Sequence, residues 1–323
     1  MSDPRAAQVR VPGSCSNLGA GFDCVGFAVD RWLTASVVVA EDAADDDAPP
    51  VTVHRSGTLE GLTLAAADDA LMTGFRAACA MAGRVVPGHI TFTAHSQIPV
   101  ARGLGSSSAA LVAGALLASD AMALGLDRDA LAQLCTRLEG HPDNAAPALF
   151  GGAVLGVPQE MSGGSRQWTF APLPVHDTLA FAFSVPPFPI ETATARAALP
   201  RELPFRVAVS AVGKSAALVH GLATGDAALL RLALDDVLHV PYRRQLIPGM
   251  SEVVTAAIDA GAFGATISGS GSTLVAIAPG SSAARVAESM RDRWLALGVQ
   301  AEAFVQRRPG PGATGRVGET TDG

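Results

Sequence analysis

The sequence predicts a two-domain protein of the α+β class. Its 323 residues are a length typical of about two domains. Hydrophobic residues make up 49% of the chain and charged residues 16%, and because aromatic residues make up only 5%, the core must consist of Ala, Val, Leu and Ile. Strand-like and helix-like segments are mixed, with a change of texture between residues 155 and 170. We therefore expect one domain at 1–160 and a second at 161–307.

Hydrophobic patterning divides the first domain into helices and strands. Apolar residues at helical spacing predict helices over 69–82, 109–122 and 128–138. Short apolar runs rich in β-branched residues predict strands at 9–11, 32–39, 51–54, 89–94 and 151–157. The acidic segment 41–50 is predicted to be a solvated loop, because it lacks the glycine turn of a calcium-binding loop.

The second domain has the same mixture. Helices are expected at 192–199, 207–222, 227–238, 251–260 and 281–297. Strands are expected at 179–186, 266–268, 273–278 and 300–306. The tail at 308–323, RPGPGATGRVGETTDG, is rich in Gly, Pro and Thr and is predicted to be disordered.

Charge and cysteine content argue against several classes of protein. The formal net charge of −7 gives no global basic field for nucleic acid. The four cysteines show no CxxC spacing, so free thiols in a cytosolic protein are expected. The first residues, MSDPRAAQ, lack an apolar signal segment, and no apolar stretch is expected to reach the roughly 18 residues of a membrane span. We therefore expect a cytoplasmic protein that binds neither nucleic acid nor membrane.

The segment PVARGLGSSSAALVAGALLA, from Pro99 to Ala118, places glycines and serines directly before a predicted helix. The first backbone N–H groups of a helix lack partners, and together with the helix dipole they favour an anion. Gly103 and Gly105 allow the backbone to approach a phosphate closely. The segment is therefore interpreted as a cradle for nucleotide phosphates, with an ordinary helix start after a flexible turn as the alternative.

Two commoner nucleotide motifs are excluded. The segment AVSAVGKS at 208–215 fits a loose Walker A pattern, but its interior is Val-Ser-Ala-Val and its apolar spacing continues as a helix. The segment GAGFDCVG at 19–26 resembles GxGxxG, but Cys24 replaces the third glycine and no βαβ unit surrounds it.

Three other stretches carry polar chemistry: 12–26, 138–152 and Ser268–Thr273. In the second, Glu139, His141, Asp143 and Asn144 fall within six residues, and their side chains suit a hard cation and a polar substrate. A polar junction between a helix and a loop is the alternative. The third stretch, SGSGST, is either a hairpin turn or a second backbone wall around a ligand.

In this order the stretches resemble the three motifs of the GHMP kinase superfamily, which appear here as PGSCSNLGAGFD, PVARGLGSSSAA and SGSGST. The segments EGHPDNAAPALFGG and HVPYRRQLIPG are similar to the homoserine kinases within it. The likeness covers residues 9 to 306. It implies an N-terminal α/β domain with a left-handed crossover, a ferredoxin-like C-terminal domain, and transfer of a phosphoryl group from ATP to the hydroxyl of L-homoserine, on the route to threonine. Because the family is often dimeric, a homodimer is the expected assembly.

The resemblance also implies roles for individual residues. Mg²⁺ would be held by Ser107 and Glu139, whose hydroxyl and carboxylate suit an octahedral oxygen site. ATP would be bound by Pro99, Arg102, Gly103, Leu104, Gly105, Ser106, Ser107 and Ser108. The substrate would be bound by Asn17, Asp23, His141, Asn144, Thr192, Arg196, Arg243 and Gly269. His141 and Asn144 would orient the reacting hydroxyl, the two arginines would grip the carboxylate, and Asp23 would face the ammonium group.

Two rival interpretations remain at this point. Arg196 and Arg243 would fit any alcohol that carries a carboxylate, so another small-molecule kinase of the same superfamily is one alternative. A homologue that binds ligands without catalysis is the other, although the expected metal ligands and glycines are all present. Ala70 stands where the family usually has asparagine near the adenine pocket, which leaves the nucleotide preference open.

Overall fold

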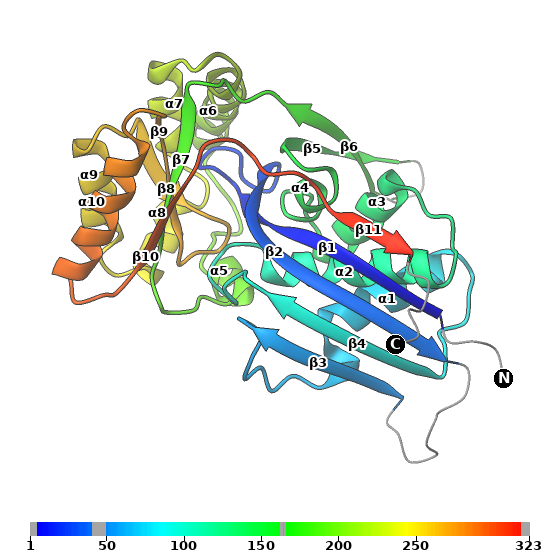
Figure 1. Ribbon diagram of the computed structural model, residues 1–323. Helices are drawn as coiled ribbons and strands as arrows, with labels where there is room; N and C mark the ends of the chain where they lie inside the picture. The colour runs from blue at the N-terminus through cyan, green and yellow to red at the C-terminus, as the bar shows by residue number, and fades with distance from the viewer. Residues whose placement is uncertain (1–4, 41–49, 162–163, 165, 318–323) are drawn as a thin grey trace.

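The computed structural model describes residues 5–40, 50–161, 164 and 166–317, and the predicted acidic loop lies almost wholly outside them. Among these residues, one sheet of seven strands has the order β11-β1-β2-β4-β3, with β5 beside β2 and β6 beside β5 (Figure 1). Its strands are β1 (Arg5–Ser16), β2 (Val25–Ala40), β3 (Val51–Gly57), β4 (His89–Ser96), β5 (Ala153–Glu160), β6 (Arg166–Leu173) and β11 (Thr314–Val317).

The parallel pair in this sheet is β3 and β4, and every other pair in it is antiparallel. The chain passes from β3 to β4 through α1 (Ala70–Met81), which lies behind the sheet in Figure 1, so the connection is the expected left-handed crossover. The same face carries α2 (Ser106–Ala121), α3 (Arg128–Glu139) and the short α4 (Ala145–Phe150).

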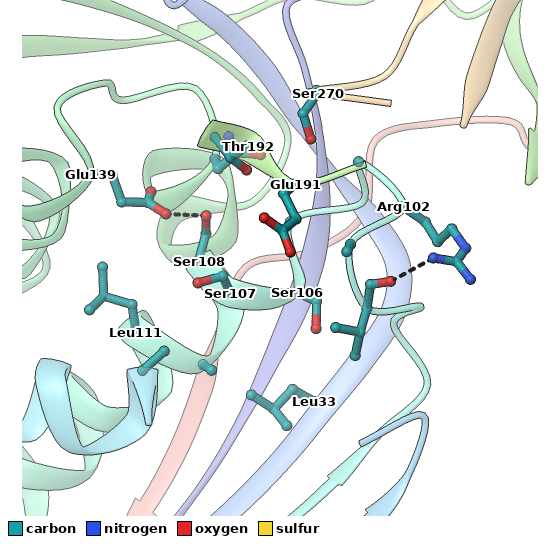
Figure 2. A pocket seen from close by; sticks show the side chains of 18 of the residues that line it. Leu33, Arg102, Ser106, Ser107, Ser108, Leu111, Glu139, Glu191, Thr192 and Ser270 are labelled. Carbon is teal, nitrogen blue, oxygen red and sulfur yellow. Dashed lines mark hydrogen bonds between the residues drawn. The ribbon is translucent and has the colours of Figure 1, made fainter. Parts of the chain in front are cut away.

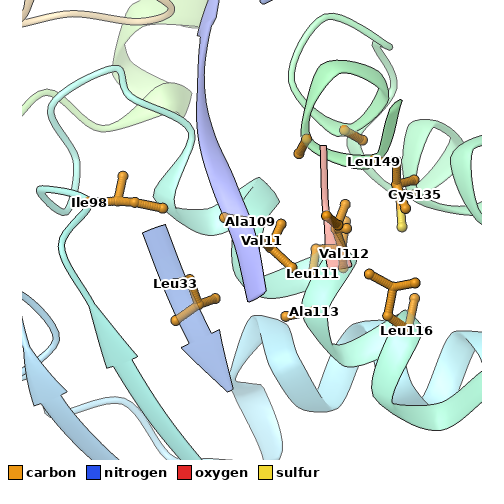
Figure 3. Packing of buried hydrophobic residues seen from close by; sticks show 14 of the residues in the cluster. Val11, Leu33, Ile98, Ala109, Leu111, Val112, Ala113, Leu116, Cys135 and Leu149 are labelled. Carbon is orange, nitrogen blue, oxygen red and sulfur yellow. The ribbon is translucent and has the colours of Figure 1, made fainter. Parts of the chain in front are cut away.

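Small residues allow α2 to lie in the middle of the core. A Cβ at Gly114 would come 1.9 Å from the carbonyl oxygen of Leu71, and a Cβ at Gly74 would come 2.0 Å from that of Leu111. The two helices can therefore approach only because neither glycine carries a side chain. Val112 and its neighbours on α2 then pack against Val11 and the rest of the sheet (Figure 3). This packing fixes the start of α2 relative to the strands.

The second sheet is antiparallel, with strand order β10-β7-β9-β8, as the ferredoxin-like expectation requires. Its strands are β7 (Leu179–Val185), β8 (Gly264–Ile267), β9 (Leu274–Pro279) and β10 (Glu302–Gln306). Helices α9 (Met250–Asp259) and α10 (Ala283–Ala296) pack together and against it, and bury Met290 and Trp294. The segment between β7 and β8 also contains α5 (Thr192–Ala197), α6 (Phe205–Thr224), α7 (Ala227–Leu234) and α8 (Val240–Arg243).

The prediction of a disordered tail is wrong for residues 308–317. Figure 1 shows β11, at the C-terminal end of the colour range, beside β1, and Ala313 is 2% exposed. Gly310 donates to the carbonyl of Ala28 at 2.7 Å and accepts from the N–H of Gly152 at 2.8 Å. Arg128 donates to the carbonyls of Leu149 and Ala313. Long-range pairing therefore orders a segment whose local composition favours disorder.

Several boundaries and one strand also differ from the sequence expectation. The helix expected at 109–122 begins at Ser106, and the helix expected at 227–238 stops at Leu234, before Asp236 accepts from the N–H groups of His239 and Val240 at the start of α8. The strand β6 was not expected, and it extends the first sheet past residue 160. The four cysteines are free, as predicted.

One helix in the described part of the chain, α6, is long and apolar enough to cross a membrane by length and composition, with a mean hydropathy of 1.3. The expectation that no stretch reaches this length is therefore not met by α6. The helix carries Arg206 and Lys214, and it packs against α7, with Leu218 and Leu222 fully buried. The segment 208–215, which fits a loose Walker A pattern, lies inside α6, as predicted.

Candidate active site

A cavity of about 730 Å³ is lined by residues from the first sheet and its helices and by residues from the segment that follows β7. This volume lies within the range of small-molecule sites. Figure 2 shows three parts of its lining: the start of α2 with its three serines, Glu139, and the residues around Thr192. Of the residues predicted from the sequence, Pro99 and Leu104 do not line it, and Leu104 is buried in the core.

Hydrogen bonds join three glycine-rich stretches of the chain, at 12–26, 99–108 and 268–273. The N–H of Ser14 donates to the carbonyl of Leu104 at 3.1 Å, and the N–H of Gly269 donates to that of Ser16 at 3.1 Å. The hydroxyl of Ser268 donates to the carbonyl of Gly103 at 2.7 Å. These stretches, which are far apart in the sequence, therefore form one continuous wall.

The start of α2 has the geometry of an anion site. Gly105 precedes the helix with φ of 69°, a left-handed conformation that favours glycine, and no side chain caps the helix. The first bond of the helix runs from the N–H of Ala109 to the carbonyl of Gly105 at 2.8 Å, so the N–H groups of Ser106, Ser107 and Ser108 precede it. Anions are favoured at such a position.

Position 103 requires glycine because the backbone at Ser268 lies too close for a side chain. A Cβ at this position would come 2.1 Å from the carbonyl oxygen of Ser268, and its φ of 74° is also left-handed. Arg102, in contrast, points away from the three serines in Figure 2, and its guanidinium donates to the carbonyls of Val100 and Pro187. The structure thus gives Arg102 a contact with the loop before α5.

Glu139, the last residue of α3, points at the start of α2. Its Oε1 accepts a hydrogen bond from Ser108, whereas its Oε2 is buried and has no partner among the described residues. Burial raises the pKa of this carboxyl to about 7, against the opposing charge of His141 and the bond from Ser108. Ser107, the residue expected to share a cation with Glu139, is exposed on the first turn of α2. The contact between Ser108 and Glu139 was not predicted from the sequence.

The loop after α3 forms a polar chain. Nδ1 of His141 lies 2.6 Å from Oδ1 of Asp143, which is 2% exposed, and Nδ2 of Asn144 donates to the same oxygen at 3.2 Å. Burial lowers the pKa of His141, but the bond to Asp143 and its charge outweigh burial and raise that pKa to about 9. Asn144 also accepts a hydrogen bond from the hydroxyl of Ser14 at 2.9 Å.

Two arginines and an aspartate also line the cavity. Arg196 on α5 donates two bonds to Asp23, at 2.6 and 2.8 Å, which is the bidentate geometry that guanidinium and carboxylate groups favour. Arg243 is 3% exposed and donates to the carbonyls of Ala195 and Gly269. Asn17 donates to Gly269 as well, at 2.9 Å. The residues predicted to bind a substrate are therefore brought together.

The described residues contain one cluster of possible metal donors, Asp23, His141 and Asp143. It differs from the predicted pair of Ser107 and Glu139. In this cluster Asp143 is paired with His141, and Asp23 is paired with Arg196. Because the charges are already compensated, the cluster does not fit a cation, whereas the unpartnered oxygen of Glu139 does.

The remaining part of the cavity is apolar. Val53, Leu59, Leu62, Leu64 and Leu111 line it, together with Ala70. Arg55 and Asp69 form an ion pair at its edge, with 2.6 Å between Nη2 and Oδ2, and Asp69 also caps α1. Such an apolar wall suits the flat aromatic ring of a nucleobase. Glu191, beside Thr192, is a further lining residue that sequence reasoning missed because nothing in its local pattern marks it.

Comparison with known proteins places this geometry in a family. The model of the GHMP kinase N-terminal domain matches residues 70–152, and that of the GHMP kinase C-terminal domain matches residues 218–296. A homoserine kinase from Picosynechococcus sp. is 36% identical over 299 residues, which cover 92% of this chain and 95% of that protein. The chain belongs to the GHMP kinases. A second relative of this GHMP kinase, homoserine kinase from Thermus thermophilus, is 37% identical over 298 residues, covering 90% of this chain and 96% of that protein.

Solved structures agree with this assignment. Homoserine kinase from Cytophaga hutchinsonii superposes on this GHMP kinase with a TM-score of 0.82 at 27% identity, covering 98% of this chain and 99% of that one. Mevalonate kinase from L. major superposes with a TM-score of 0.63 at 15% identity, covering 96% and 97%, which shows the shared fold alone.

Proposed function

We propose that the protein transfers the γ-phosphoryl group of ATP to the side-chain hydroxyl of L-homoserine, forming O-phospho-L-homoserine on the route to threonine. Relatives that carry this activity in their names match more than nine-tenths of the chain. The observation that carries the proposal is a single cavity with two kinds of lining. One is an open helix start, here called the nucleotide end, and the other is the ion pair of Asp23 and Arg196 together with Arg243, here called the substrate end. An anionic nucleotide and a zwitterionic amino acid would each find its complement there.

The nucleotide end uses backbone groups. The N–H groups of Ser106, Ser107 and Ser108 would donate to phosphate oxygens, and Gly103 and Gly105 would keep side chains out of the way. The base would lie against the apolar wall near Leu62 and Ala70. Phosphoryl transfer asks a protein mainly for such positioning and for stabilisation of charge.

Glu139 and Ser107 would hold Mg²⁺ at the same helix start. Oε2 of Glu139 is buried without a partner among the described residues, and a cation would remove the cost of that burial. Oxygen ligands from a carboxylate and a hydroxyl suit Mg²⁺. When bound, the ion would neutralise charge on the transferred phosphoryl group.

The substrate end would exchange its own ion pair for a ligand. The carboxylate of an amino acid would take the place of Asp23 on Arg196 and would also meet Arg243, while its ammonium group would take the place of Arg196 on Asp23. Asn17, Thr192 and the carbonyl of Gly269 complete this end.

His141 and Asn144 would orient the reacting hydroxyl between the two ends. Asp143 holds the ring of His141 and the amide of Asn144, so its role is electrostatic and structural. A dedicated carboxylate base is not required, because a loose phosphoryl-transfer transition state tolerates weak base assistance.

A panel of alcohols with coupled detection of ADP tests the proposal. Turnover is expected with L-homoserine and Mg²⁺-ATP, and 4-hydroxybutyrate, which lacks the ammonium group, should react far more slowly. Turnover of mevalonate or another carboxylate-bearing alcohol, with none of L-homoserine, would assign the protein to a different kinase activity. No turnover of any alcohol would favour a homologue that only binds ligands.

Replacement of Arg243 by leucine should raise KM for L-homoserine. The variant loses a charge-assisted contact and leaves the carbonyl of Ala195 without its donor, at a cost of about 1.5–3 kcal/mol, or roughly ten- to a hundredfold in KM. Steady-state kinetics of Arg243→Leu would be compared with those of Arg244→Leu, whose exposed guanidinium should not matter. An effect of Arg243→Leu on KM for ATP alone would rule out the substrate-side role.

The domain division and assembly are also proposals. In the first sheet β6 pairs with β5 and β11 pairs with β1. These pairings support a nucleotide-binding domain that runs to Leu173 and includes residues 308–317, with a ferredoxin-like domain at 179–306. The homodimer, the cytoplasmic location and the absence of nucleic-acid and membrane partners stay predictions.

A further inference from the structure

Phe22 contacts Arg196 and Arg243, which line the cavity, and the roles described above do not involve it. It is half-buried in the connection between β1 and β2, directly before Asp23. The guanidinium carbon of Arg196 lies 5.6 Å from the centre of its ring, and that of Arg243 lies 5.2 Å from the same point. Both distances are within the roughly 6 Å over which a cation is attracted to an aromatic face.

Two positive charges this close oppose one another. Arg243 has backbone carbonyls as its hydrogen-bond partners, at Ala195 and Gly269. The carboxylate of Asp23 is paired with Arg196. Asp143 and Asp236 act on Arg243 through their charges and not through a hydrogen bond. Burial lowers the pKa of Arg243, and the charge of Arg196 lowers it further. An electron-rich ring shared by both guanidinium groups offsets part of this repulsion without occupying either group's hydrogen-bond donors.

The ring of Phe22 also packs against His239. The two rings stack with 4.9 Å between their centres and 20° between their planes, and His239 is fully buried. Nε2 of His239 lies 3.2 Å from the carbonyl of Gly19, to which it donates. Burial lowers the pKa of His239 to about 4, so that it stays neutral and adds no third positive charge beside the arginines.

We propose that Phe22 is a positioning residue that holds the side chains of Arg196 and Arg243 where one substrate carboxylate can bind both. The inference rests on the proposed function only for the choice of acceptor. A phenyl ring has no hydrogen-bonding group, so Phe22 acts on the carboxylate only through the two arginines. Loss of the ring would let the guanidinium groups separate and weaken binding of the acceptor without touching the nucleotide end.

Two variants and a modified residue test this role. Phe22→Leu keeps apolar bulk but removes the ring, and we expect KM for L-homoserine to rise about tenfold with KM for ATP unchanged. Phe22→Tyr keeps the ring and should restore KM to within about threefold of the wild type. A trifluorinated phenylalanine at this position, introduced by amber suppression, keeps the shape and weakens the ring's attraction for cations, so KM should again rise.

Phe304→Leu is the matched control, because the guanidinium of Arg31 lies 4.5 Å from the centre of that ring, in β10 and not among the residues that line the cavity. Its KM for L-homoserine should equal that of the wild type. If Phe22→Leu leaves KM unchanged, or if the fluorinated protein behaves like the wild type, the positioning role is wrong.

The outcome for Phe22 is separable from that for the proposed function. Turnover of L-homoserine by the wild type tests the function, and the ratio of KM values between variants tests Phe22. Should another carboxylate-bearing alcohol prove to be the acceptor, the same ratios are measured with that alcohol.

Discussion

Glu139→Gln is expected to lower kcat by roughly two to three orders of magnitude, the effect typical of removing one group that stabilises charge in a transition state. The amide keeps the size of the side chain and can still accept from Ser108, but it replaces the buried charge that faces the start of α2. Burial disfavours the charged form of this carboxyl and raises its pKa to about 7, whereas a neutral amide can be buried without that cost. The unfolding temperature should therefore equal or exceed that of the wild type.

Steady-state kinetics over a range of Mg²⁺ concentrations, together with thermal unfolding, would measure both effects. Glu160→Gln is the matched control, because Glu160 is an exposed carboxylate that pairs with Arg166 at the end of β5. That variant should retain wild-type kcat. Near-normal turnover in Glu139→Gln, with the control also active, would show that Glu139 is not a metal ligand.

Deletion of residues 309–323 is the second change with a large expected effect. It removes the pairing of β11 with β1, both backbone bonds of Gly310, and the bond from Ala313 to the carbonyl of Ala148 on α4. At about 1 kcal/mol for each hydrogen bond, the loss is about 3–5 kcal/mol, and burial of Ala313 adds to it. Since α4 follows Asp143 and Asn144, kcat should fall as well.

Chemical unfolding of the truncated protein would measure this loss. Arg128→Met leaves the tail in the chain but removes its two side-chain bonds, to Leu149 and Ala313, so it should show a smaller decrease in stability. It also provides a measurement if the truncated protein fails to fold. An unchanged unfolding midpoint in both variants would contradict the packing of the tail.

The sequence predicted the mixed fold and the three loops because their signals are local. Glycines and serines before an apolar run mark the start of α2 whatever surrounds it, and the apolar spacing at 208–215 identifies a helix instead of a phosphate loop. The tail shows the limit of such reasoning. Its Gly- and Pro-rich composition favours disorder, and its order depends on β1 and Arg128, which lie far away in the sequence.

In the candidate site, too, local sequence signals identified residues, whereas their long-range contacts could not be predicted. The residues around Asp23, Arg196 and Arg243 could be identified by resemblance, but the pairing of Asp23 with Arg196 depends on how α5 meets the β1–β2 connection. Three consecutive serines look alike in a sequence, and the packing of α3 against α2 makes Ser108 the one that contacts Glu139.

The central claim is that the N–H groups that precede the first helical hydrogen bond of α2 bind the phosphates of ATP. A crystal structure with Mg²⁺ and a non-hydrolysable ATP analogue measures this directly. We expect phosphate oxygens within hydrogen-bond distance of the N–H groups of Ser106, Ser107 and Ser108, with the ion beside Glu139. A triphosphate bound elsewhere on the protein would contradict the account.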